Sequence, residues 1–225
     1  MKMAIFAEMF QKIDFKNKLI MKKLTLISTI LCVMGSLMSC DSEKNEGAVN
    51  QNDNTAAIIE NIMTRTSIRQ FTDRPIAKDT LDLLVKAGMA APSAVNAQPW
   101  GFVIVTDRAV LDSLNNVSQY YNLKTATAAI IVCGDLNKTK PEIKDYWVQD
   151  CSAVTENILL AAHAYGLGAV WCGVYPIEDR VKAVSSVLSL PESILPLNVI
   201  TLGYPDENPQ PKDKFKEENI HYNKW

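Results

Sequence analysis

The chain has 225 residues, of which 48% are hydrophobic and 21% are charged. It is therefore long and apolar enough to form a domain with an ordinary hydrophobic core. Its formal net charge of −2 at pH 7 and its lack of basic blocks argue against a protein that binds nucleic acid. We find no internal repeat.

Residues 1–40 have the pattern of a secretory signal. Two lysines precede an apolar run over residues 24–38, and small residues lead to Cys40, as in a signal with a basic region, an apolar region and a cleavage point. The run is shorter than the ~20 residues that usually cross a bilayer. Leu37 and Ser39, at the third and first positions before Cys40, resemble a bacterial lipoprotein signal, in which this cysteine is lipidated.

Lipidation at Cys40 would place the chain at the cell envelope as a lipid-anchored membrane protein, periplasmic or on the surface. Polar residues 41–54 would then form a flexible tether to a domain over residues 55–225. The alternatives are an ordinary cleaved signal, an uncleaved anchor, or a cytoplasmic protein in which the signal is misread. Met21 is followed by two lysines and is an alternative start.

Two helices are predicted at the beginning of the domain. Residues 56–63 carry isoleucines on one side and end at the basic stretch "TRTSIRQF", residues 64–71. The second helix follows Pro75 in "KDTLDLLVKAGMAA", with apolar residues at helical spacing and Asp79 or Thr80 as the capping candidate.

The next stretch, "APSAVNAQPW" (91–100), is a candidate binding loop. Pro92 disfavours the helical region for the residue before it, so the second helix should end near Ala90. The loop is rich in amide and hydroxyl groups and leads into a predicted strand over residues 102–105. Rigid polar loops between packed elements often carry binding sites, whereas an ordinary loop is the alternative. We expect Trp100 to anchor the loop by packing in the core.

Further strands are predicted at residues 129–133 and 197–202, and a long helix at residues 150–165 with Gly166 as its C-cap. The helix is rich in alanine and apolar around much of its circumference. It is therefore either a buried core helix or one that also lines a subunit interface. The order of elements suggests a mixed sheet covered by helices.

Cysteine and histidine usage supports neither a disulfide framework nor a metal site. Cys133, Cys151 and Cys172 follow the signal, an odd number without a CxxC pair, although one disulfide is possible in an oxidising compartment. His163 and His221 lack ligand partners at helical spacing. We expect His163 to be a packed or hydrogen-bonded residue and not part of a Cys/His nucleophilic pair. The stretch "GLGAVW" lacks a third glycine and follows a helix, so the dinucleotide fingerprint fails.

Taken together and in this order, four stretches resemble the nitroreductase family of flavin enzymes over nearly all of residues 55–225: "TRTSIRQF", "APSAVNAQPW", "LLAAHAYGLGAVWCGVY" and "GYPDENPQPKDKFKEENIHYNKW". The resemblance implies an α+β fold with a central mixed or antiparallel sheet flanked by helices. It also implies an intertwined homodimer with one FMN at each of two interface sites. The implied reaction is reduction of nitroaromatics, quinones or other conjugated electrophiles, with NADH or NADPH as the electron donor.

FMN carries a phosphate, a polyhydroxyl chain and a ring whose reduced form holds negative charge near N1 and O2. The resemblance implies that Arg65 contacts the phosphate and Ser67 the phosphate or the ribityl chain, with Thr66 also at the cofactor. Arg69 is the basic residue expected beside N1 and O2, where positive charge favours the reduced, anionic flavin. The alternative is that both arginines are solvated surface charges.

In the same family the turn after the second helix reaches across the dimer to the flavin of the partner subunit. The implied contacts are Pro92, Ser93 and Ala94. Asn96 and Gln98 are expected to hold this loop in shape or to contact the ring.

Two more groups complete the implied site. Cys172, Gly173 and Val174 align with the segment along the flavin from which a backbone N–H is expected near N5, and a glycine permits close approach. Many relatives carry an acidic residue where this chain has Gly173. Lys212 and Lys214 align with a second pair of phosphate cations; at the latter an arginine is more usual, so charge is kept but bidentate geometry is lost.

No general acid or base is evident, and none is required if the flavin carries the redox chemistry. However, NAD(P)H is a cytoplasmic cofactor, whereas the signal predicts export. The alternative function is therefore a non-catalytic or partner-linked flavin-binding lipoprotein of the cell envelope. Bleaching of the purified protein by NADH or NADPH separates the two.

Overall fold

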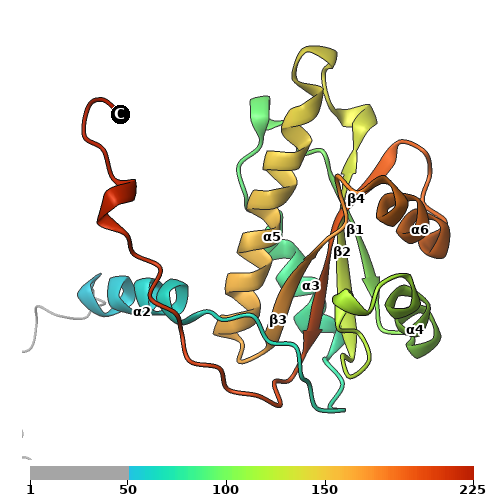
Figure 1. The fold of residues 1–225 in the computed structure, drawn as a ribbon, viewed down its shortest axis with the longest axis horizontal. Coiled ribbons are helices and arrows are strands. Elements are labelled where there is room, and N and C mark those ends of the chain that lie inside the picture. Colours follow the sequence, from blue (N-terminus) through green and yellow to red (C-terminus); the bar gives the residue numbers. More distant parts are fainter. Residues whose placement is uncertain (1–50) are drawn as a thin grey trace, which may run out of the picture. The chain divides into compact units, whose positions relative to one another are not determined.

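Four β-strands form an antiparallel sheet in the structure, a computed structural model that describes residues 51–225 (Figure 1). The strands are β1 (Trp100–Val105), β2 (Ala128–Asp135), β3 (Gly168–Gly173) and β4 (Ile194–Gly203). Their order is β1-β2-β4-β3, and every neighbouring pair is antiparallel. A mixed or an antiparallel sheet was expected, and the observed sheet is antiparallel. Strand β3 lies at an edge of the sheet and was not predicted from the sequence.

The predicted signal, its lipidation site Cys40 and tether residues 41–50 lie outside the described residues. Residues 56–225 form one compact unit, and the description that follows concerns this unit. Among the described helices, none is both long and apolar enough to cross a membrane.

Helices cover both faces of the sheet (Figure 1). The burial pattern of β2 explains why both faces are covered. Its first seven residues are all buried, and successive side chains of a strand point to opposite faces. Ile130 and Val132 belong to one apolar cluster, and Ala129 and Ile131 belong to the other. The helices packed in these clusters are α3 (Lys78–Gly88) and α5 (Trp147–Ala164) on one face, and α4 (Arg108–Val117) and α6 (Glu178–Leu188) on the other.

The long helix α5 begins three residues before the predicted start and ends near the predicted position. At its end Gly166 adopts a positive φ of 68°, and the N–H of Leu167 bonds to the carbonyl of Ala162 over 2.9 Å. This left-handed turn is the glycine cap that the sequence predicts. At the other end, the Trp147 ring covers Gly134, where an added Cβ would come within 2.3 Å of the ring, so this contact requires a glycine.

The predicted cap of α3 was wrong. The N-cap is Ala77, without a side-chain hydrogen bond, and Asp79 lies inside the first turn. There its carboxylate still faces the positive end of the helix dipole. The helix ends at Gly88, two residues before the Ala90 expected from the following proline.

The first and last segments of the unit are largely exposed. Helix α2 (Gln51–Thr64) begins before the predicted residue 56, so residues 51–54, assigned to the tether, are helical. After β4, residues 205–225 are all exposed; Pro205 forms an isolated bridge with Phe71, and residues Glu217–Asn219 form a short 3-10 turn. Large apolar side chains stand exposed on both segments: Ile58, Ile59, Ile62 and Met63 on α2, and Phe215, Ile220, Tyr222 and Trp225 on the C-terminal segment.

Candidate functional site

The stretch after α2 is fixed beside the edge strand β3. The N–H of Ile68 bonds to the carbonyl of Ala169 over 3.0 Å, and the N–H of Thr72 bonds to the carbonyl of Tyr204 over 2.9 Å. Ile68 and Phe71 are buried against two glycines, Gly168 and Gly203, whose added Cβ atoms would meet them at less than 3 Å. These apolar contacts hold the polar residues between them at the surface of the unit.

A cavity of about 640 Å³ opens beside this stretch. Its charged lining consists of four cations and one carboxylate, which gives a formal charge of +3, suited to a phosphate dianion. Six of the sequence-predicted residues meet here. The lining comprises Ile62 and Met63 of α2; Arg65, Thr66, Ser67 and Arg69 of the stretch that follows; Glu156 of α5; and Pro209, Gln210, Lys212, Lys214 and Phe215 of the C-terminal segment.

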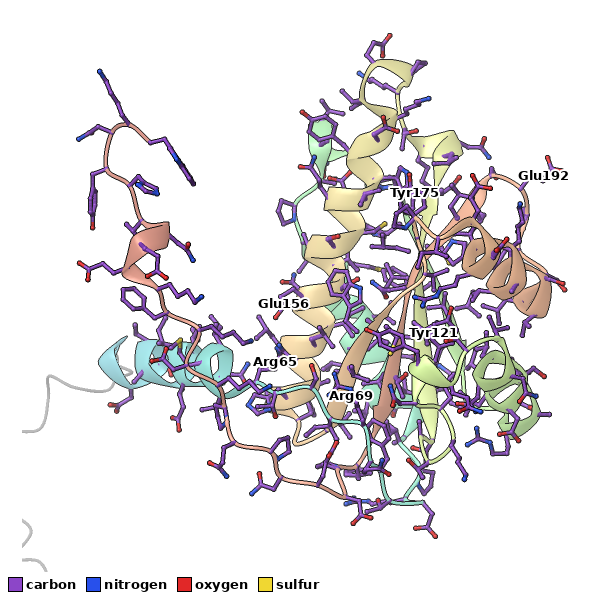
Figure 2. The ribbon with its side chains drawn as sticks, viewed as in Figure 1. Arg65, Arg69, Tyr121, Glu156, Tyr175 and Glu192 are labelled. Carbon is purple, nitrogen blue, oxygen red and sulfur yellow. The ribbon has the colours of Figure 1, made fainter. Side chains whose placement is uncertain are left out.

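Arg65 is not a solvated surface residue. Its side chain is 17% exposed, and its Nε lies 3.4 Å from Glu156 Oε1. Figure 2 shows the two side chains facing each other between the stretch after α2 and helix α5. Glu156 was not predicted from the sequence, because it lies 91 positions away on another element and only the fold brings it to Arg65.

A second unpredicted carboxylate, Glu207, attaches the C-terminal segment to the cavity. Its Oε1 accepts from the backbone N–H of Arg69 at 2.5 Å and of Gln70 at 3.1 Å. Asp206 adds a bond from its N–H to the carbonyl of Gln70, 2.9 Å long. These bonds direct the following lysines, Lys212 and Lys214, to the same cavity as Arg65.

Arg69 also lines a second, smaller cavity of about 270 Å³. The lining there is polar and includes the Asn122 amide and the Lys124 ammonium group. Asn122 has a left-handed φ of 55° and donates to the carbonyl of Tyr120 over 2.6 Å. Arg69 is therefore shared by the linings of both cavities.

The free edge of β3 follows the same side of the unit. The carbonyl of Ala169 bonds to Ile68 and that of Gly173 to Arg180 Nη1 at 3.2 Å, so both point away from β4. Since alternate residues of a strand direct their backbone groups to the same side, the N–H groups of Trp171 and Gly173 also point off this edge. A Cβ added at Gly173 would meet no atom within 4 Å, which leaves room for a planar ligand.

Cys172 and Val174 flank this glycine but keep their side chains buried. The Cys172 Sγ lies 3.4 Å from the carbonyl oxygen of Tyr120, and burial raises the pKa of the thiol. Of these three predicted residues, only backbone groups and the open face of Gly173 are available to a ligand.

The loop with Pro92, Ser93, Ala94 and Asn96 does not reach the cavity within one chain. It is attached near the beginning of α5, where Asp150 Oδ1 accepts from the N–H of Ala94 at 2.9 Å. The stretch after α2 lies near the other end, where Thr64 Oγ1 and His163 Nε2 are 3.0 Å apart. Thirteen residues of helix separate Asp150 from His163, which corresponds to about 20 Å.

Hydrogen bonds hold this loop in an unusual conformation. Ser93 Oγ accepts from the N–H of Gln98 at 3.0 Å, and Gln98 Nε2 donates to Asn96 Oδ1 at 3.0 Å. Asn96 and Gln98 therefore hold the loop in shape, one of the two roles expected. Val95, Asn96 and Gln98 all have positive φ, from 47° to 55°, which is costly for residues other than glycine. Trp100 is buried in the core, as predicted.

The remaining cysteine and histidine side chains do not form a nucleophilic site. Cys133, Cys151 and Cys172 are free, and burial raises the pKa of both Cys133 and Cys151 to about 12, so these thiols stay protonated. His163 is hydrogen-bonded, and burial together with Arg65 lowers its pKa. Within residues 51–225, no group of three or more His, Cys, Asp or Glu side chains is arranged to hold a metal ion.

Known proteins resemble this chain in sequence. The profile described as "Nitroreductase family" matches residues 62–119 and 116–204. A protein of Methanothermobacter thermautotrophicus, provisionally named NADH dehydrogenase/NAD(P)H nitroreductase, is 47% identical over 169 residues, covering 75% of this chain and 87% of that protein.

Solved structures share the fold. A crystal structure from Bacteroides thetaiotaomicron with the same provisional name has a TM-score of 0.71 and 47% identity, covering 75% of this chain and 98% of the other. The NADPH:FMN oxidoreductase of Vibrio harveyi, solved with NAD⁺, has a TM-score of 0.65 and 28% identity, covering 75% of this chain and 77% of its own.

Proposed function

Because the chain belongs to the nitroreductase family, we propose that it is an NAD(P)H oxidoreductase that holds FMN beside Arg65 and reduces small conjugated electrophiles. Nitroaromatics and quinones are the acceptor classes we favour, and NADH or NADPH is the electron donor. Relatives named for FMN and for NADPH support this cofactor pair.

The observation that carries the proposal is the collection of cations in the larger cavity. Arg65 and Arg69 come from the beginning of the unit and Lys212 and Lys214 from its end, and Glu156 is the single opposing carboxylate among the lining residues. Thr66 and Ser67 add hydroxyl groups suited to the phosphate or the ribityl chain. The volume lies within the roughly 300–1,000 Å³ typical of small-molecule sites.

The rest of FMN fits the polar path away from the phosphate end. Arg69 would lie beside ring N1 and O2, where its positive charge stabilises the reduced flavin. Asn122 and Lys124 of the smaller cavity would face the polar edge of the ring. The N–H of Gly173 would face N5, and the space above this glycine admits the ring.

When bound, FMN supplies the redox chemistry by taking hydride from the nicotinamide at N5 and passing electrons to the acceptor. The chain's own residues bind the phosphate, orient the ring and set its electrostatic surroundings. No side chain is needed as general acid or base, and the buried, protonated cysteines do not compete as nucleophiles. We infer a ping-pong sequence, with donor and acceptor using the same open face in turn.

A second copy of the chain would complete the site. The loop of Pro92, Ser93, Ala94 and Asn96 does not line the cation cavity of its own chain. Asp150, which holds the loop, lies six positions, or about 9 Å, before Glu156 along α5, and we propose that the loop contacts the flavin of the partner subunit. The exposed apolar side chains on α2 and on the C-terminal segment provide surface for an intertwined homodimer. Dimerisation buries such surface and is driven by the hydrophobic effect.

We further propose that Cys40 anchors the protein to the cell envelope through a lipid. The support is the signal pattern in the sequence, since Cys40 lies outside the described residues. Labelled palmitate should be incorporated by the wild-type chain, and Cys40→Ala should lose the label and become soluble while still binding FMN. Membrane association of the alanine variant equal to wild type would contradict this proposal.

The central test is the colour of the purified protein and its response to reduced nicotinamides without oxygen. We expect a yellow dimer with one FMN per chain that bleaches with NADH or NADPH and recovers its colour with a quinone. A yellow protein that neither nicotinamide bleaches would support the alternative of a partner-linked flavoprotein. A folded, colourless monomer that takes up no added FMN would overturn the proposed function.

A further inference from the structure

Arg180 of α6 contacts the backbone of the strand edge proposed for the flavin. Its Nη1 donates to the carbonyl of Gly173 over 3.2 Å, and its guanidinium lies 5.5 Å from the centre of the Tyr120 ring. The side chain is partly buried. In the part of the chain that the structure describes, no carboxylate forms an ion pair with it, whereas Lys182 on the same helix pairs with Glu178 at 3.5 Å.

The position of Arg180 in α6 gives no local reason for a cation. It is the third residue of the helix, in the first turn, where the helix dipole favours negative charge and disfavours positive charge. Its side chain turns to the strand instead of to the carboxylates of its own first turn. The contact with Gly173 is therefore the main interaction of this guanidinium.

That contact adds a restraint on Gly173, the last residue of β3, which pairs with Asn198 of β4. Gly173 has no side chain, and glycine has wide conformational freedom. On its C-terminal side, the N–H groups of Val174 and Tyr175 bond to the carbonyl of Leu197 at 3.0 and 3.1 Å. The hydrogen bond from Arg180 holds the carbonyl of Gly173, which points away from β4. The N–H of Gly173 points to this same side of the strand.

The charge of Arg180 acts at the same edge. Burial raises the pKa of Cys172, and the nearby positive charges of Arg69 and Arg180 both oppose this rise. Cys172 is next to Gly173 in the strand, and Arg180 reaches this edge through its bond to the Gly173 carbonyl. A ring placed along this edge would have one cation near its N1 and O2 and another near the Gly173 backbone.

We propose that Arg180 is a positioning residue that holds the Gly173 N–H toward flavin N5 and adds positive charge that favours the reduced flavin. This inference rests on the proposed function. It assigns Arg180 to the redox step through Gly173, and it does not require a contact between Arg180 and the substrate.

The test compares Arg180→Gln and Arg180→Lys with the matched control Lys182→Gln, each as the FMN-loaded dimer. Lys182→Gln removes the same charge from the same helix but touches only an exposed Glu178. Arg180→Gln should weaken the binding of reduced FMN relative to oxidised FMN about tenfold, which lowers the two-electron potential by about 30 mV. Arg180→Lys should recover part of this loss, because it keeps the charge but not the planar donor. Lys182→Gln should keep the wild-type potential.

A wild-type potential in Arg180→Gln would overturn the inference while leaving the proposed function intact, provided that the variant still binds FMN. A wild-type potential in Arg180→Lys would show that charge alone acts, which contradicts the positioning role. If Arg180→Gln does not fold, Arg180→Lys tests the positioning role. In that variant the amide hydrogen of Gly173 should exchange faster than in the wild type. If the wild-type chain binds no FMN, the proposed function and this inference both fail.

Discussion

The middle and the beginning of helix α5 (Trp147–Ala164) carry different kinds of structure. In the middle, Glu156 faces a cavity where cations outnumber carboxylates and much of the lining is exposed. Near its beginning, Asp150 holds a loop whose polar groups are bonded to one another and whose backbone is strained. The first region is shaped to receive an anion, and the second is a rigid loop that does not line this cavity. The difference supports our proposal that the site is divided between two copies of the chain.

The largest expected effect is in the cation cavity beside Glu156. Arg65→Ala should weaken FMN binding about ten- to a hundredfold, because a hydrogen bond to a charged group contributes roughly 1.5–3 kcal/mol. Fluorescence titration of the apoprotein with FMN measures this change. Lys78→Ala is the control, since Lys78 pairs with Asp82 on α3 and does not line the cavity; equal losses in both variants would argue against a phosphate site at Arg65.

Breaking the loop held at the beginning of α5 should also weaken FMN binding. Asp150→Ala leaves the partly buried N–H of Ala94 without its partner, at a cost of about 1 kcal/mol, and we expect a roughly tenfold loss of affinity. Asn157→Ala is the matched control, because it removes a bond from α5 to the carbonyl of Ala87 without touching the loop.

Mixed dimers of Arg65→Ala and Asp150→Ala sharpen the comparison. If each site combines the cations of one chain with the loop of the other, a mixed dimer has one intact site and one site with both defects. It should therefore bind one FMN per dimer with wild-type affinity. Two weakened sites in the mixed dimer would mean that each chain builds its site alone.

Arg69→Ala should affect the redox properties more than the binding of oxidised FMN. It removes the cation expected beside N1 and O2, so the reduction potential should fall by on the order of 30 mV, which is tenfold in relative binding. Spectroelectrochemical titration gives the value. The assignment of Arg69 would be wrong if the retained flavin kept its wild-type potential and FMN binding fell as much as in Arg65→Ala.

The smallest expected effect concerns the strain in the loop. Val95 is β-branched, exposed, and held at a φ of 47°, so Val95→Gly should raise the free energy of unfolding by up to about 1 kcal/mol. Chemical denaturation of the apoprotein measures it. Ala97 has an ordinary φ of −69°, and Ala97→Gly should instead lower stability. If the two substitutions changed stability alike, the strain at Val95 would not be significant.

Elements with strong patterns were predicted from the sequence. The apolar run of β2 reflects burial on both faces of the sheet. The alanine-rich composition of α5 is typical of a helix packed in the core, and Gly166 marks the end of that helix. The edge strand β3 was missed, because its six residues follow a helix directly and carry no clear alternation. Helices α4 and α6 were also missed. The apolar residues of α4, among them Leu111 and Leu114, follow helical spacing, so this helix could have been predicted from the sequence. Helix α6 has one buried residue, Val184, and a weaker pattern.

The candidate site was predicted in part. Arg65, Thr66, Ser67, Arg69, Lys212 and Lys214 were expected from motifs, and the fold brings them into one cavity. Glu156, Glu207, Asn122 and Arg180 were not expected. Their roles depend on contacts between elements distant in the sequence, and an isolated charged or amide residue gives no signal for such a contact.

The free edge of β3 has a consequence for the solubility of the protein. An open strand edge is a template on which another chain can add a strand, and natural proteins protect such edges from aggregation. Here Ile68 occupies the carbonyl of Ala169 and Arg180 occupies that of Gly173, so Trp171 carries the one carbonyl left open among these three residues, while the N–H groups of Trp171 and Gly173 also stay open. Too few backbone groups remain for an invading strand to pair in register, and the sheet ends at β3 without a further strand to cover it.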